Sequence, residues 1–159
     1  MSSQVLREQA PAVDAWVNLV RGHSAAVGAI NARLVADHAL TINDFECLLT
    51  LARAEDRRMR RVDLAERLIL TASGVTRLLD GLEKEGWVDR ASCATDRRVV
   101  YAVLTDEGLA KLREASETHI ADLRAYFETR YSSEELEQLA ALLGRLPADA
   151  INAETCSAD

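Results

Sequence analysis

Apolar residues in the first part of the chain recur every three or four positions. Between about Pro11 and His38 this spacing is kept by six large side chains, Trp16, Leu19, Val20, Val27, Ile30 and Leu34. Residues at these intervals lie on one face of an α-helix. The pattern therefore predicts a long first helix over residues 11–38.

Three shorter helical patterns come next. A helix over residues 41–53 begins at a threonine that can cap it. A second helix over 63–69 opens with Asp63 and Glu66, which have the spacing of a capping box. A third covers 71–86, ends at a glycine, and has an apolar face made of Val75, Leu78, Leu79 and Leu82. The last two helices are joined by a tight turn.

The period then changes to two and later returns to that of a helix. Residues 87–104 alternate around a polar turn at 92–96, and the β-branched run 99–104 predicts the second strand of a hairpin. Thr105 can cap a long helix, and a capping box at Ser132 opens a last helix that reaches Leu146 before Pro147. The predicted fold is mainly α with a small β-wing, an α+β winged helix-turn-helix at 41–104 between N- and C-terminal helices.

Composition agrees with a single helical domain over residues 1–159. The chain has 48% hydrophobic but only 4% aromatic residues, which favours helix packing over a β-sandwich. No apolar run is long enough to span a bilayer and no signal segment is visible, so we expect a soluble cytoplasmic protein without a membrane partner. Residues 147–159 are expected to form a flexible tail.

Charge is distributed unevenly. The whole chain carries a formal charge of -7, but residues 53–98 hold 11 basic and 9 acidic side chains, a net charge of +2. Phosphate binding depends on lysine and arginine, so an acidic protein with a basic middle is compatible with DNA binding by that middle.

The order of helix, turn, helix and hairpin points to a recognition helix at 71–86 and a wing at 90–99. A recognition helix presents polar side chains near its N-terminus to base edges, and Thr71, Ser73, Thr76 and Arg77 occupy that end. An ordinary solvated helix face is the alternative interpretation.

Three segments resemble the MarR family of winged-helix regulators. They read LTINDFECLLTLA, LAERLILTASGVTRLLDGLEKEGWVDR and DRRVVYAVLTDEG, and the resemblance extends from about residue 12 to residue 146. It implies a homodimer formed by helices 11–38 and 105–146, and repression by binding a pseudo-palindromic site on double-stranded DNA. It also implies that Arg98 of the wing reaches the minor groove, with Asp96 and Arg97 positioning the wing. Asp96 and Arg97 alternatively form only a surface ion pair that closes the hairpin.

A run of arginines, Arg57, Arg58, Arg60 and Arg61, precedes the short helix. The family resemblance implies a brief third strand here, beside the wing. The run is either a solvated charge cluster or a source of one or two phosphate contacts.

A finer resemblance concerns a ligand. Trp16, Glu46, Arg77 and Arg90 align with the tryptophan, aspartate and two arginines of the urate-responsive PecS/HucR-like branch. The resemblance implies an effector site for a flat anion such as urate or a phenolic acid, which an aromatic wall and guanidinium donors suit. Glu46 is one methylene longer than the aspartate of that branch. The alternatives are a dimer-core tryptophan, a Glu46–Arg77 ion pair and a phosphate contact by Arg90.

Other chemistry finds less support. Cys93 on the hairpin is a candidate redox sensor, whereas Cys47 is predicted to be a core residue and Cys156 a tail thiol. No phosphate-binding loop, nucleophile motif or metal-ligand spacing is present, so we predict no enzyme, cofactor or metal. The competing class is a winged-helix protein-interaction module that does not bind DNA.

Overall fold

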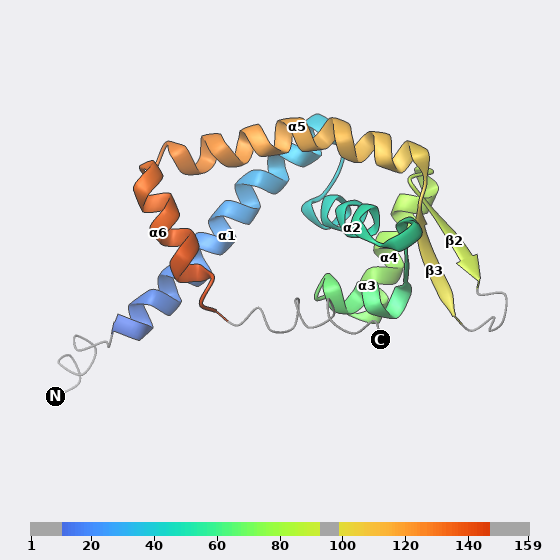
Figure 1. Ribbon diagram of the computed structural model, residues 1–159, viewed down its shortest axis with the longest axis horizontal. Coiled ribbons are helices and arrows are strands. Elements are labelled where there is room, and N and C mark those ends of the chain that lie inside the picture. Colours follow the sequence, from blue (N-terminus) through green and yellow to red (C-terminus); the bar gives the residue numbers. More distant parts are fainter. Residues whose placement is uncertain (1–10, 93–98, 147–159) are drawn as a thin grey trace. The chain divides into compact units, whose positions relative to one another are not determined.

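The computed structural model describes residues 11–92 and 99–146, which fall into two compact units divided between Ile42 and Asn43. The first unit contains helix α1 (Pro11–His38), drawn in blue in Figure 1, with the bounds that the sequence predicts. The buried side chains of α1, Ile30, Leu34 and His38, lie in its last third. The backbone N–H of Ile42 donates to the side-chain oxygen of Asn31 at 2.9 Å, which holds the turn after α1.

The second unit contains the predicted winged helix-turn-helix and the two C-terminal helices. Its elements are α2 (Ile42–Arg53, from the end of the first unit), a 3-10 turn η1 (Glu55–Arg57), β1 (Arg58–Arg60), α3 (Arg61–Arg67), α4 (Ala72–Lys84), β2 (Val88–Ser92), β3 (Val100–Leu104), α5 (Asp106–Glu128) and α6 (Ser133–Leu143). The mainly α fold with a small β-wing is confirmed. No helix among the described residues is long and apolar enough to cross a membrane.

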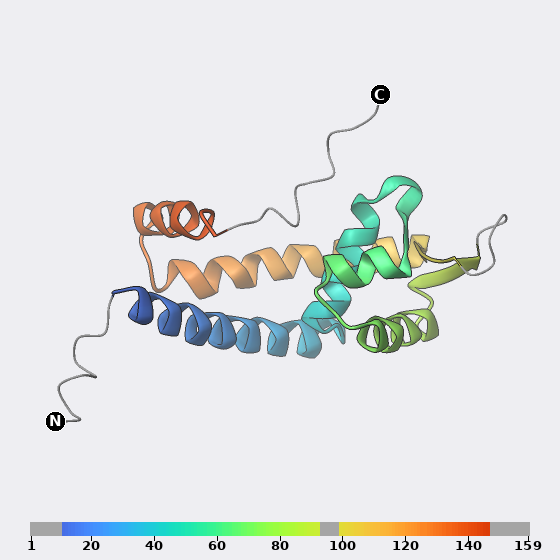
Figure 2. The ribbon, with the colours of Figure 1, turned by 90° about the horizontal axis from the view of Figure 1, so that it is seen from below.

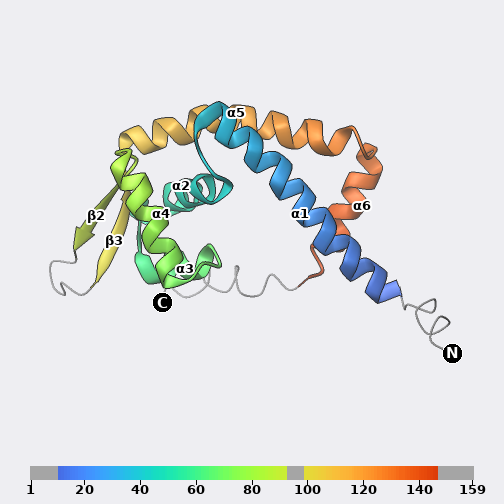
Figure 3. The same cartoon turned by 180° about the vertical axis from the view of Figure 1, so that it is seen from behind.

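The three strands form one antiparallel sheet in the order β1-β3-β2. Arg90 of β2 and Met59 of β1 both lie opposite Ala102 of β3, so these three side chains share one face of the sheet. Ala102 is fully buried, which identifies this face as the one that packs on the core. The hairpin of β2 and β3 lies beside α4 and extends past the helices of the second unit (Figures 2 and 3).

The core of the second unit is formed by leucine-rich faces of α2, α3 and α4 together with the sheet and α5. Its most deeply buried members are Cys47, Leu48, Leu51, Leu64, Val75, Val88, Ala102 and Ala115, all at 0% exposure. The ring of Phe45 on α2 contacts that of His119 on α5, with centroids 4.5 Å apart. The predicted core position of Cys47 is confirmed.

Most predicted helix ends are confirmed by cap geometry. Thr71 caps α4 and Thr105 caps α5, each accepting a hydrogen bond from a backbone N–H three residues on. Ser132 and Glu135 form the predicted capping box of α6. Gly86, with φ of 76°, ends α4 in the left-handed conformation that suits glycine.

Three helix boundaries differ from the prediction, and one of them is the end of α3, which lies at Arg67 and not at Ile69. Helix α3 begins at Arg61, two residues before the predicted start, and Asp63 lies inside its first turn. Asp63 caps nothing because its carboxylate accepts two hydrogen bonds from Arg60, at 2.6 and 2.8 Å. At the other end of the chain, α6 stops at Leu143 and not at Leu146, because Gly144 is a poor helix residue and begins a turn.

A tight junction joins α4, β2 and α5. The hydroxyl of Thr105 donates to the carbonyl oxygen of Gly86 at 2.7 Å, and its backbone N–H donates to that of Trp87 at 3.1 Å. Gly108 is buried against the same segment, and a Cβ there would lie 2.0 Å from the Trp87 oxygen. The start of α5 is therefore fixed directly to the end of α4.

Candidate nucleic-acid interface

Helix α4 has one buried and one solvent-facing side. Val75, Leu79 and Leu82 are buried, whereas the opposite side carries exposed polar residues, Ser73, Arg77, Asp80 and Lys84. Positions that differ by three, four or seven lie on one face of a helix. The polar face thus starts in the first turn of α4 and continues to its C-terminus.

The hydroxyl groups at the start of α4 hold the helix itself. Thr71 Oγ1 accepts from the Gly74 N–H at 3.0 Å and lies 3.2 Å from the hydroxyl oxygen of Ser73. The Thr76 hydroxyl, which is half-buried, donates to the carbonyl of Ala72 at 2.8 Å. Ser73 is the most available of these three hydroxyl groups for an external partner.

Arg77 is an exposed cation in the N-terminal half of this face. It forms no hydrogen bond or ion pair with any residue that the structure describes. The suggested ion pair between Glu46 and Arg77 is therefore absent from the described interactions. A guanidinium with five unused donors can bind a base edge, a phosphate or an anionic ligand.

Arg90 has a different environment. From β2 its guanidinium hydrogen-bonds Asp80 of α4, and its Nε lies 3.0 Å from the carboxylate of Glu83 on the same helix. Asp80 and Glu83 lie about one helical turn from each other, so a single arginine can reach both carboxylates. Arg90 is held by carboxylates of α4 and is not a free cation.

The arginine run before α3 is divided by its partners. Arg57 pairs with Asp106 at 2.8 Å, Arg58 with Asp56 at 3.6 Å, and Arg60 with Asp63. Hydrogen bonds that the Arg60 guanidinium donates to the Asp63 carboxylate raise the pKa of Arg60 above its ordinary value. The implied third strand is present as β1. Arg61, by contrast, has no partner among the residues that the structure describes.

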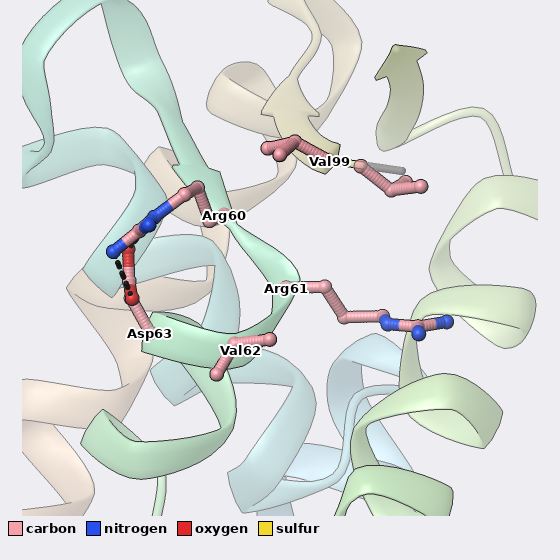
Figure 4. A pocket seen from close by; sticks show the side chains of 6 residues that line it. Arg60, Arg61, Val62, Asp63 and Val99 are labelled. Atoms are coloured by element: carbon pink, nitrogen blue, oxygen red, sulfur yellow. Dashed lines mark hydrogen bonds and ion pairs between the residues drawn. The ribbon is translucent and has the colours of Figure 1, made fainter. Parts of the chain in front are cut away.

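An open hollow of about 190 Å³ lies where α3 begins beside the first residues of β3. It is lined by Arg60, Arg61, Val62, Asp63, Val99 and Val100. Figure 4 shows Arg60 turned toward Asp63, while the Arg61 side chain extends in another direction, away from that pair. The site thus offers one available guanidinium beside valine side chains at the base of the wing.

The residues proposed for an effector lie on separate elements. Trp16 is on α1 in the first unit and is 65% exposed, whereas Glu46 is exposed on α2 in the second unit. None of the four effector residues lines the hollow beside the wing. Asp96, Arg97 and Arg98 of the wing, and Cys93, lie outside the described residues.

Burial shifts the pKa values of one cysteine and one histidine away from their ordinary values. Burial, assisted by the charge of Asp44, raises the pKa of Cys47 to about 12. Burial also lowers the pKa of His119, against an opposing effect of Asp122. Within the described part of the chain, no group of three or more candidate ligands can hold a metal ion.

Sequence reasoning missed the acidic members of this surface. Asp80 and Glu83 were visible as polar residues of the recognition helix, but their partner Arg90 lies seven to ten positions away across a turn. The pairing of Arg57 with Asp106 spans 49 positions. The only available signal was the three-residue spacing of Asp80 and Glu83, which places both on neighbouring parts of one face.

Comparison with known proteins agrees with this geometry. The sequence profile of the MarR family matches residues 40–100. The regulator PecS of Dickeya dadantii is 31% identical over 154 residues, which cover 94% of this chain and 92% of PecS. The repressor YetL of Bacillus subtilis is 35% identical over 111 residues, 70% of this chain and 66% of YetL.

Solved structures show the same fold. Sco3205, a MarR family transcriptional regulator of Streptomyces coelicolor solved in complex with DNA, is 27% identical and superposes with a TM-score of 0.74 over 85% of this chain and 88% of its own. The match in sequence extends over nearly the whole length of a known regulator, and the match in structure covers 85% of this chain. The chain belongs to the MarR family of transcriptional regulators.

Proposed function

We propose that this regulator acts as a homodimeric repressor that binds a pseudo-palindromic DNA site through α4 and the wing. The observation that carries the proposal is the exposed face of α4, where Arg77 is without a partner among the described residues and Ser73 is accessible. In this proposal Thr71 and Thr76 fix the first turn, Ser73 and Arg77 meet the major groove, and Arg98, with Asp96 and Arg97 positioning the wing, enters the minor groove.

The dimer is supported by apolar side chains that each unit leaves exposed. In the first unit, Val13, Trp16 and Val20 are 42%, 65% and 44% exposed on the part of α1 that contains no buried residue. In the second, α6 has no buried residue and exposes Leu142 and Leu143. Large exposed apolar side chains on terminal helices are typical of an interface. A second copy of the chain is the proposed partner, and sedimentation at several concentrations tests it.

Arg61 adds a phosphate contact at the edge of the same surface. The three other arginines of the run already have carboxylate partners, and only a cation without such a partner gains a full charge interaction from a phosphate. Arg61 extends from the start of α3, the helix that precedes α4. It is therefore the member of the run that we assign to the DNA backbone.

For the experiment, the wild-type chain first selects a DNA duplex from a random-sequence pool. Affinity for that duplex is then measured at a series of salt concentrations. Arg61→Ala is expected to weaken binding to all sequences alike and to reduce the slope of log K against log salt by about 0.9. Arg60→Ala is the matched control, since the charge of Arg60 is already neutralised by Asp63. Equal slopes for wild type and Arg61→Ala would refute the phosphate contact.

Two results test the wider proposal. Arg77→Ala is expected to weaken binding and to relax sequence preference, because a bidentate arginine contact discriminates bases by about 1–3 kcal/mol. Failure of the wild-type chain to enrich any sequence from the pool would reject DNA recognition. It would instead support the protein-interaction module.

A second proposal concerns an anionic or aromatic effector, such as urate or a phenolic acid, that releases the regulator from DNA. It is supported by the available guanidinium of Arg77 and the exposed Trp16, but Arg90 must first leave Asp80 and Glu83 to take part. Thermal unfolding with urate, xanthine and salicylate is the test, because a ligand at 100 times its dissociation constant stabilises by about 2.7 kcal/mol. An unchanged transition with all three excludes them as effectors.

A further inference from the structure

We infer that Arg90 is a positioning residue for DNA binding, which acts by occupying Asp80 and Glu83 so that Arg77 stays available. The inference rests on the proposed DNA-binding function. It differs from both roles considered for Arg90 above, a ligand contact and a phosphate contact, because here Arg90 touches neither.

Charges of opposite sign follow one another along the exposed face of α4. Arg77, Asp80 and Lys84 are separated by three and four positions, so Asp80 lies between two cations on one face. Pairs at these spacings form ion pairs on helices. Asp80 nevertheless pairs with Arg90 of β2, and no described interaction joins it to Arg77 or Lys84.

The three partners of this ion-pair cluster differ in solvent exposure. The Arg90 side chain is 33% exposed, less than those of Asp80 at 58% and Glu83 at 42%. The guanidinium of Arg90 is therefore more enclosed than the two carboxylates that it binds. This enclosure argues against Arg90 as a direct phosphate contact.

Strand β2 is held in place by backbone pairing and by burial of its first residue. The strand pairs with β3 at five positions and its first residue, Val88, is fully buried. Exposed ion pairs add little to the stability of such an arrangement, typically much less than a buried apolar side chain adds. Arg90 is therefore not needed to fasten the wing to α4, and its main effect is on charge.

The charges of Asp80, Glu83 and Arg90 matter for the sugar-phosphate strand that separates the major groove from the minor groove. A helix in the major groove and a wing in the neighbouring minor groove lie on either side of a sugar-phosphate strand, and the ion pairs of Arg90 with Asp80 and Glu83 join α4 to the first strand of the hairpin. Two carboxylates there repel phosphate unless a cation compensates them. Without Arg90, Asp80 is left to pair with Arg77, one turn earlier on the helix.

The test measures affinity for the selected duplex at 50 mM and 300 mM salt. Arg90→Ala is expected to bind roughly tenfold more weakly at low salt, equivalent to about one charged hydrogen bond. The deficit should shrink at high salt as screening increases. The control Arg124→Ala removes one exposed positive charge of α5 that has no partner in the described part of the chain, and should bind as the wild type does.

Rescue separates the possible roles of Arg90. The triple variant Arg90→Ala, Asp80→Asn, Glu83→Gln is expected to regain wild-type affinity, and Asp80→Asn with Glu83→Gln alone to equal or exceed it. If Arg90 contacts phosphate directly, the triple variant stays weak, and if Arg90 only fastens the wing, the double variant loses affinity. Either result overturns the inference.

A further comparison uses Arg77. Since Arg90→Ala lets Asp80 capture Arg77, the loss caused by Arg77→Ala should be several-fold smaller in that background than in the wild type. Strictly additive losses would contradict the inference while leaving DNA binding by the wild type intact. A wild-type chain that binds no DNA would overturn the proposed function itself, and this inference with it.

Discussion

Replacing Gly108 by alanine is expected to destabilise this protein, although the same exchange normally stabilises a helix by about 1 kcal/mol. An added Cβ would lie 2.0 Å from the carbonyl oxygen of Trp87, 2.8 Å from Cδ1 of Leu104 and 2.9 Å from the carbonyl carbon of Trp87. The nearest of these atoms belongs to the backbone. The start of α5 and the segment after α4 must therefore move apart by roughly an ångström or more to reach ordinary van der Waals contact.

The magnitude follows from the contacts that this movement disturbs. Overpacking of this kind costs about 1–3 kcal/mol, and the hydrogen bond of 3.1 Å between the Thr105 N–H and the Trp87 oxygen contributes about 1 kcal/mol more when it is lost. After subtraction of the gain in helix propensity, the net loss is about 1–3 kcal/mol. For a chain of this size that corresponds to a fall in Tm of roughly 2–12 °C.

The assay is urea unfolding followed by circular dichroism at one fixed protein concentration, because dimerisation couples stability to concentration. Gly81→Ala is the matched control: Gly81 lies within α4, and nothing lies within 4 Å of the position of its added Cβ. That variant should gain up to about 1 kcal/mol. The reasoning is refuted if Gly108→Ala is as stable as the wild type or more so.

Two further predictions concern the titratable groups Cys47 and His119, whose pKa values are shifted by desolvation. Because the pKa of Cys47 is about 12, its thiol should resist a thiol-specific reagent at pH 8 in the native protein and react at once in urea, as mass spectrometry of the labelled peptide would show. Rapid native labelling of Cys47 would contradict its burial. His119 has a pKa below its ordinary value of about 6.5, so below that pH the unfolded chain binds a proton that the folded chain excludes, and stability should fall as pH drops from about 7 toward 5. His119→Gln should show a smaller decrease in Tm between pH 7.5 and 5.5, and an equal decrease would assign the effect to other groups.

The elements that sequence predicted well are those whose signals are local. Thr71, Thr105 and the Ser132 capping box mark helix starts within three residues, and Gly86 marks an end by the backbone conformation it permits. Each of these signals depends on contacts between near neighbours in the chain. The helix-turn-helix and the hairpin could therefore be located before any tertiary contact was known.

The boundary of α3 could not be predicted in the same way. Asp63 and Glu66 have the spacing of a capping box, but the carboxylate of Asp63 instead binds the guanidinium of Arg60. A charged partner competes with a backbone N–H and gives the stronger hydrogen bond. The sequence pattern shows that an acceptor is present without showing which donor it takes.

In the candidate interface, too, the partners of charged side chains could not be predicted from the sequence, because many of them are distant in the chain. Composition showed that residues 53–98 are rich in arginine, but it did not show that Arg57 is neutralised by Asp106 or Arg90 by two residues of α4. Whether an arginine is available to DNA depends on tertiary neighbours. The contrast between Arg60 and Arg61, adjacent in sequence and different in partners, required the structure.

Because α5 is fixed to one end of α4 at Thr105, a small rotation at this junction produces a larger displacement at the other end of α4. Thr105 and Gly108 fix α5 to the C-terminal end of α4, whereas Ser73 lies at the other end of that helix, about 17 Å away at 1.5 Å per residue. A rotation of about 10° at the junction displaces Ser73 by about 3 Å, which is more than a hydrogen bond tolerates. A small tilt at the start of α5 is thus enough to move the recognition residues out of register with the base edges that they meet.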